Sequence, residues 1–96
     1  MDTSVFEELW DTICSRMENP PEKSYVVEIL THRKGLDKAL EKVGEEATEF
    51  ILAAKNDDYE QKVYEAADLI FHLMLALRGS DVEFSDVIEE LKRRHR

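Results

Sequence analysis

Apolar residues recur along this chain at the three- and four-residue intervals of amphipathic helices, and no segment alternates as a strand would. Near the start, Ser4 and Glu7 resemble a capping box. The apolar stripe behind them comprises Val5, Phe6, Leu9, Trp10, Ile13 and Met17. Asn19-Pro20-Pro21 cannot continue a helix, because proline lacks the amide proton and clashes with the preceding turn. The pattern predicts a first helix that begins near Ser4.

The same periodicity predicts that the rest of the chain is helical, with turn residues marking the ends. After the first helix, the second is predicted at about Tyr25 to Leu30 and the third at about Leu36 to Lys55. The fourth is capped by Asp57 or Asp58 and ends at Gly79, and the fifth covers about Ser85 to Arg94. The apolar face expected on the third of these five helices comprises Leu36, Ala39, Leu40, Val43, Ala47, Phe50, Ile51 and Ala54. No repeat or linker divides the chain. We expect one all-α domain of four to five helices over residues 1–96.

The fourth predicted helix is apolar on every side from Leu69 to Leu77, apart from His72. A helix of this kind is normally buried all round, and four or five short helices cannot surround one. A second copy of the chain would cover it. We therefore expect a helical bundle completed by oligomerisation, as a homodimer or a higher homo-oligomer.

Two carboxylate pairs are the most informative chemical feature, Glu46-x-x-Glu49 and Glu65-x-x-Asp68. Residues three apart on a helix point to the same side. The short polar turn 55–58 makes the two helices antiparallel neighbours, so the four carboxylates can converge. Hard cations such as Mg²⁺ take oxygen ligands of this type and often bridge to substrate phosphates. The spacing predicts a Mg²⁺ site for phosphate chemistry.

Each of these features also has a plainer interpretation. Helix surfaces are rich in glutamate, and a Lys42–Glu46 pair contributes only a few tenths of a kcal/mol. His72 either assists Asp68, contacts substrate or is a satisfied core residue. Gly44, which costs about 1 kcal/mol inside a helix relative to alanine, either permits a close approach or is simply tolerated at a crowded crossing. The basic loop 32–35 suits phosphate oxygens but also an ordinary charged loop.

Composition limits the classes of partner that this chain can bind. With 43% hydrophobic and 36% charged residues the chain should fold rather than stay disordered. A formal net charge of −9 argues against nucleic acid or an anionic membrane as a partner. The single Cys14 excludes an intrachain disulfide, and no apolar run is long enough to span a bilayer. The acidic N-terminus is not a signal peptide. We expect a cytoplasmic protein.

Three segments resemble the phosphoribosyl-ATP pyrophosphohydrolase family, which belongs to the MazG-like all-α nucleotide pyrophosphohydrolases. They are Lys42-Val43-Gly44-Glu45-Glu46-Ala47-Thr48-Glu49, Ala53-Ala54-Lys55-Asn56 and Glu65-Ala66-Ala67-Asp68-Leu69. The likeness extends to Ser24-Tyr25, Gly35 and His72, and so covers nearly the whole chain. The family commonly has threonine after the Ser-Tyr pair, where this chain has Val26.

The resemblance implies hydrolysis of phosphoribosyl-ATP to its AMP form and pyrophosphate, the second step of histidine biosynthesis, with Mg²⁺. It implies that the Mg²⁺ ligands are Glu46, Glu49, Glu65 and Asp68. Glu45 could hold a second ion or orient the attacking water, which makes Glu45, Glu46 and Glu49 the catalytic candidates. The candidates for phosphate contacts are Arg33, Lys34, Lys42 and Lys55.

Two other functions remain open from the sequence. The wider ExxE…ExxD motif would equally serve a housekeeping pyrophosphohydrolase of ordinary or damaged nucleoside triphosphates. A non-catalytic helical dimerisation module, whose acidic stripe binds a structural cation or a basic partner, is the alternative from another class. Mg²⁺-dependent release of pyrophosphate would separate both enzymes from that module.

Overall fold

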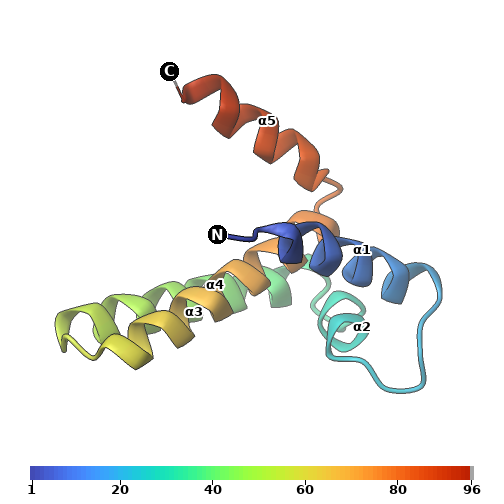
Figure 1. Ribbon diagram of the computed structural model, residues 1–96. Helices are drawn as coiled ribbons and strands as arrows, with labels where there is room; N and C mark the ends of the chain where they lie inside the picture. Colours follow the sequence, from blue (N-terminus) through green and yellow to red (C-terminus); the bar gives the residue numbers. More distant parts are fainter. Residues whose placement is uncertain (96) are drawn as a thin grey trace.

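A computed structural model of the chain describes residues 1–95, which form five α-helices and no strand (Figure 1). The helices are α1 (Ser4–Glu18), α2 (Tyr25–Leu30), α3 (Leu36–Lys55), α4 (Tyr59–Gly79) and α5 (Phe84–Arg94). The predicted all-α class is confirmed, and α2 and α3 have the bounds that the sequence predicted. Helix α5 begins one residue earlier than expected. None of the helices described for residues 1–95 combines the length and the hydrophobicity of a membrane-spanning helix.

Helices α3 and α4 form a long antiparallel hairpin that dominates the molecule (Figure 1). The turn between them places Asp57 at a positive φ of 53°, a conformation that aspartate tolerates better than most residues. Asp58 is the N-cap of α4, and its Oδ1 accepts a hydrogen bond from the Gln61 amide at 3.2 Å. Of the two predicted capping residues, Asp58 is therefore the one used. The short turn gives the antiparallel arrangement that the carboxylate prediction required.

The capping box predicted at the start of α1 is wrong. Thr3 is the N-cap, and no side-chain hydrogen bond caps this helix. Ser4 is already helical, and its amide donates to Asp2 Oδ1 at 2.9 Å. Ser4 is therefore the first helical residue and not the N-cap, so its hydroxyl does not cap the helix.

The core lies at one end of the hairpin, where α1 and α2 pack across the start of α3 and the end of α4 (Figure 1). Its largest fully buried side chains are Ile13, Met74 and Leu75. The Phe84 ring stacks on Trp10 with ring centroids 5.6 Å apart, which attaches the start of α5 to α1. Beyond this contact α5 projects away from the other helices (Figure 1), and none of its residues is buried.

Large apolar side chains are exposed along the length of the hairpin. Leu40 and Ile51, predicted on the buried face of α3, are 49% and 57% exposed, whereas Ala53, which was not predicted there, is buried. On α4, Tyr59, Val63, Ile70 and Leu73 are exposed on one side and Tyr64 on another. The spacing of Leu40 and Ile51 likewise puts them on one side of α3. These two residues and the first four on α4 are called the hairpin face below. As expected, one chain does not cover α4 on all sides.

Candidate functional site

The four predicted carboxylates come together between α3 and α4. One oxygen from each of Glu46, Glu49 and Glu65 lies within 4.8 Å of the others. Glu46 also lies within 4.8 Å of ligand atoms of Asp68 and His72. The two members of each pair are one turn apart on the same helix. The antiparallel hairpin places the pair on α3 opposite the pair on α4. We call Glu46, Glu49, Glu65 and Asp68 the carboxylate cluster.

Two members of the carboxylate cluster are buried without a hydrogen-bond partner. The exposed fractions of Glu46 and Glu65 are only 4% and 9%. Their Oε2 atoms are inaccessible to solvent and accept no hydrogen bond from the described residues. Desolvating a carboxylate oxygen costs free energy unless a donor or cation compensates. Buried oxygens that lack donors and converge from several carboxylates suit a hard divalent cation, so the donor set fits a metal such as Mg²⁺.

The crowding of negative charge is visible in the pKa values of these two residues. Burial raises the pKa of Glu46 to about 7, with further contributions from Asp68 and Glu49. Burial is also the main cause that raises the pKa of Glu65, followed by its contacts with Glu49. Raised pKa values gathered in one place indicate a site that is costly to maintain and is often functional.

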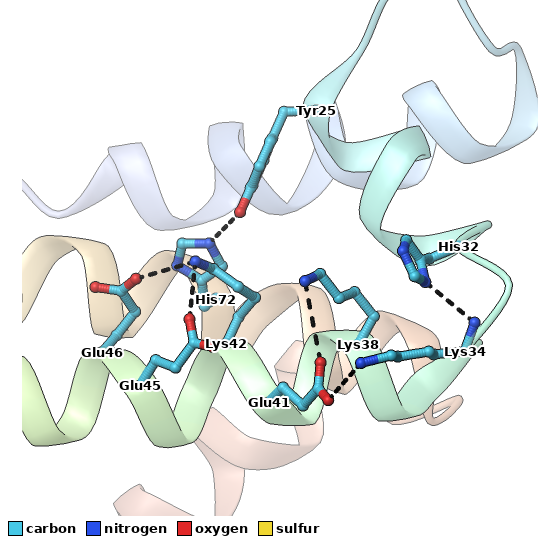
Figure 2. A network of polar contacts seen from close by, with 9 residues as sticks. All are labelled: Tyr25, His32, Lys34, Lys38, Glu41, Lys42, Glu45, Glu46 and His72. Atoms are coloured by element: carbon cyan, nitrogen blue, oxygen red, sulfur yellow. Dashed lines mark hydrogen bonds and ion pairs between the residues drawn. The ribbon is translucent and has the colours of Figure 1, made fainter.

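Lys42 is the predicted phosphate contact that lies beside the carboxylate cluster. Its Nζ is 3.5 Å from Glu46 Oε1 and 3.2 Å from Glu45 Oε2 (Figure 2). Its hydrogen bond to Glu45 is the main cause that raises the pKa of the Lys42 ammonium. The Lys42–Glu46 pair of the plainer interpretation therefore exists, but its glutamate is buried, unlike that of an ordinary surface pair.

The other predicted phosphate contacts lie elsewhere. Lys34 donates to Glu41 Oε1 at 2.9 Å near the start of α3, well away from Glu46 in Figure 2. Arg33 is in the same exposed loop. Lys55 is in the last turn of α3, about 13 Å along the helix axis from Glu46 at ~1.5 Å per residue. The structure does not bring these three side chains to the carboxylate cluster.

Glu45 and Gly44 differ from the other residues of their motif. The Glu45 side chain is largely exposed and pairs with Lys42, outside the groups of carboxylates that converge. An added Cβ on Gly44 would meet no atom within 4 Å. The crowded helix crossing considered for Gly44 is therefore absent from residues 1–95, and the glycine lies on an open surface of α3.

Sequence reasoning missed one residue beside the cluster. The Tyr25 hydroxyl lies 2.7 Å from His72 Nε2 and joins α2 to α4 (Figure 2). On the other side of the ring, His72 Nδ1 lies 2.8 Å from the Asp68 carbonyl oxygen and 3.3 Å from Asp68 Oδ1. The signal for Tyr25 was the Ser24-Tyr25 pair, which entered only through the family resemblance. Ser24 is the N-cap of α2, and its hydroxyl accepts from the Val27 amide at 3.4 Å.

The chain is similar to known proteins over nearly its whole length. A sequence model of the family described as phosphoribosyl-ATP pyrophosphohydrolase matches residues 6–95. A protein of Methanoculleus marisnigri named phosphoribosyl-ATP pyrophosphatase is 56% identical over 95 residues, which cover 99% of this chain and 98% of that protein. One of the same name from Methanocorpusculum labreanum is 62% identical over 91 residues, 94% of this chain and 88% of that protein. The chain therefore belongs to the phosphoribosyl-ATP pyrophosphohydrolase family.

Proposed function

We propose that this chain hydrolyses phosphoribosyl-ATP to phosphoribosyl-AMP and pyrophosphate, the second step of histidine biosynthesis, with Mg²⁺ held by the carboxylate cluster. Membership of the family makes the chain a hydrolase of a pyrophosphate bond. The substrate is the one that the relatives' names give. The metal is inferred from the residues of this chain.

The observation that carries the proposal is the pair of buried, unpartnered oxygens on Glu46 and Glu65. A purely structural pair of glutamates would have a hydrogen-bond donor for each buried oxygen. Here one cluster gathers carboxylates from two helices, with Lys42 as its neighbouring cation. A bound divalent cation would complete the coordination of these oxygens and would stabilise the negative charge of the polyphosphate as the anhydride breaks.

The side chains divide the remaining work. Hydrolysis adds water across the anhydride between the α- and β-phosphorus atoms, and a carboxylate accepts the proton that the water loses. Glu49 is the exposed member of the cluster on α3 and stands beside buried Glu46 and Glu65, which suits it to orient that water. Lys42 Nζ is within reach of both the cluster and solvent, so it can donate to a phosphate oxygen.

We also propose that the working form is a cytoplasmic homo-oligomer, a homodimer or larger. The exposed apolar residues of the hairpin face support this. The lone Cys14, which is free, fits a reducing compartment. The net charge of −9 supports a small-molecule substrate rather than nucleic acid.

A substrate panel tests the activity. Purified protein is given phosphoribosyl-ATP, ATP or a deoxynucleoside triphosphate, each with Mg²⁺ and with EDTA, and pyrophosphate release is measured. We expect release from phosphoribosyl-ATP in Mg²⁺ and none in EDTA. Faster release from ordinary triphosphates would assign the chain to the housekeeping role, and no release from any substrate would favour the non-catalytic module.

Substitutions in the cluster test the assignment of residues. Glu49→Gln or Glu65→Gln should lower kcat about 100-fold or more, because each removes a charge that stabilises the transition state through the metal. Both variants should stay helical by circular dichroism. Glu8→Gln, on the exposed surface of α1, is the matched control and should retain full activity. Turnover like that of the wild type in either cluster variant would remove that residue from the site.

A further inference from the structure

Tyr25 and His72 connect the short helix α2 to the carboxylate cluster. His72 is almost fully buried, and it lies one turn beyond Asp68 on α4. Tyr25 is at the start of α2, which is anchored in the core through Val26 and Ile29. The Tyr25 ring also meets the His72 ring edge-on, with centroids 5.7 Å apart. The hydroxyl and the imidazole are therefore held in register by packing as well as by their hydrogen bond.

The partners of the imidazole determine which of its nitrogens carries the proton. His72 Nδ1 lies 2.8 Å from the backbone carbonyl of Asp68. A carbonyl oxygen can only accept, so Nδ1 must be the protonated nitrogen. In the neutral ring, Nε2 then has a lone pair and accepts from the Tyr25 hydroxyl at 2.7 Å. The donors point in one direction, from Tyr25 to His72 and from His72 to Asp68.

This arrangement separates His72 from the metal ligands. One atom of His72 lies within 4.8 Å of oxygens of Glu46 and Asp68, a distance at which it could share a cation with them. Both of its ring nitrogens are occupied, however, one by the carbonyl and the other by the tyrosine hydroxyl. His72 Nδ1, which donates to the Asp68 carbonyl, also lies 3.3 Å from Asp68 Oδ1. The ring therefore lies against one oxygen of the Asp68 carboxylate and makes no such contact with the second.

We propose that Tyr25 and His72 are positioning residues that hold the Asp68 carboxylate in its metal-binding orientation. The inference rests on the proposed function only for the presence of a divalent cation. Residues that contact metal ligands generally act in this way, because they fix the rotamer of the ligand before the metal binds. The pair makes α2 part of the site although α2 supplies no residue of the carboxylate cluster. It also explains a tyrosine at a half-exposed position, which ordinary core packing would not require.

The first test reads the tautomer directly in the wild-type protein. Nitrogen-15 NMR of the histidine side chains, at a pH of about 8 where an ordinary imidazole is neutral, should show His72 protonated at Nδ1 and not at Nε2. Addition of Mg²⁺ should leave this tautomer in place. A ring protonated at Nε2, or shifts on adding metal that indicate ligation through a ring nitrogen, would overturn the proposal.

The second test uses amide side chains as partial mimics of the ring. His72→Asn places an amide nitrogen near the position of Nδ1, whereas His72→Gln places one near Nε2. Mn²⁺ serves as the probe because it prefers the same oxygen ligands and its binding is measured by electron paramagnetic resonance. We expect His72→Gln and His72→Leu to weaken Mn²⁺ binding about tenfold or more, and His72→Asn to restore most of that loss.

Tyr25→Phe should weaken Mn²⁺ binding by a smaller factor, about threefold, because it acts through His72. Tyr64→Phe, which removes an exposed hydroxyl on α4 outside the hairpin face, is the matched control and should bind as the wild type does. Melting temperatures in EDTA establish that each variant is folded. If His72 only filled space, Gln would be tolerated at least as well as Asn, and that order would overturn the proposal.

The outcomes keep the two proposals apart. Weakened Mn²⁺ binding in these variants without hydrolysis of phosphoribosyl-ATP by the wild type would leave the positioning role intact and reject the function. Hydrolysis of phosphoribosyl-ATP by the wild type, with Mn²⁺ binding unchanged in all His72 variants, would support the proposed function and reject the positioning role. A wild-type protein that binds no Mn²⁺ would overturn both.

Discussion

Glu46 combines deep burial with charge in a way that its neighbours on α3 do not. Its carboxylate lies close to Asp68 on α4 and to Glu49 and the Lys42 ammonium on α3 itself. Burial is the largest cause that raises its pKa to about 7. The ordinary value of 4.5 applies once the chain unfolds. The difference connects protonation of this residue to the stability of the fold.

The sign of that connection is fixed by which state binds the proton more tightly. The folded state holds the Glu46 proton more tightly, so protonation favours folding below pH 4.5, and the benefit is lost as pH rises from there through about 7. In EDTA, the melting temperature of the wild type should therefore fall across this interval more steeply than that of Glu46→Gln. Thermal melts by circular dichroism measure both slopes.

Bound metal should offset the loss of stability near neutral pH, because a cation that binds only the folded protein stabilises it. Added Mg²⁺ should raise the melting temperature of the wild type at neutral pH and should raise that of Glu46→Gln much less. Glu8→Gln, on the surface of α1, should follow the wild type under every condition. Identical pH profiles for the wild type and Glu46→Gln would show that Glu46 is ionised in the folded protein at no cost.

At the scale of the helices, sequence patterns predicted where each helix begins and ends better than which of its sides is buried. Helices α2 and α3 have their predicted bounds because prolines, a glycine and a polar turn mark their ends. Gly35 precedes α3 with φ of 60° and ψ of −137°, a conformation open essentially to glycine alone. Leu40 and Ile51 were expected to be buried because apolar spacing identifies a face, but spacing cannot tell whether the same chain covers it.

Gly44 lies on that same side of α3, four residues after Leu40 and seven before Ile51. With open space around it, replacement by alanine would normally raise the free energy of unfolding by about 1 kcal/mol. We expect Gly44→Ala to lack this gain and to weaken self-association, because in the proposed oligomer the second chain approaches here. Urea denaturation and light scattering measure the two effects. A gain of about 1 kcal/mol with unchanged association would show that nothing packs against Gly44.

At the scale of the whole molecule, what could be predicted depends on separation along the chain. The carboxylate cluster was predictable because its members lie in one hairpin, and helix periodicity with a short turn is enough to bring them together. The Tyr25–His72 contact joins residues 47 positions apart. It depends on how α2 packs on the core, which local pattern does not determine. The position of the loop that carries Arg33 and Lys34 likewise depends on tertiary packing, so their role as phosphate contacts stays a prediction.

The exposed hairpin face leads to a prediction about assembly. Apolar patches of this kind on one chain usually mark a contact with another. Light scattering at micromolar concentration should report at least a dimer of the 11.2 kDa chain. Ile70→Asp should shift the protein toward monomer, because it would bury an unpaired charge in the interface. Val5→Asp, at an even more exposed apolar position on α1, should not. A folded wild-type monomer at this concentration would contradict the proposed assembly.

The attachment of α5 has a consequence for the timescale on which different parts of the chain open. Its first residue, Phe84, stacks on Trp10, but no residue of the helix is buried. A segment held by so little apolar contact unfolds locally at a small free energy, whereas the buried part of α4 opens only with the whole domain. Amide hydrogens of α5 should exchange with deuterium within seconds to minutes, and those around Met74 and Leu75 far more slowly. Phe84→Ala should speed exchange throughout α5 and leave α4 unchanged. Equal protection of α5 and α4 would mean that a second chain covers the last helix.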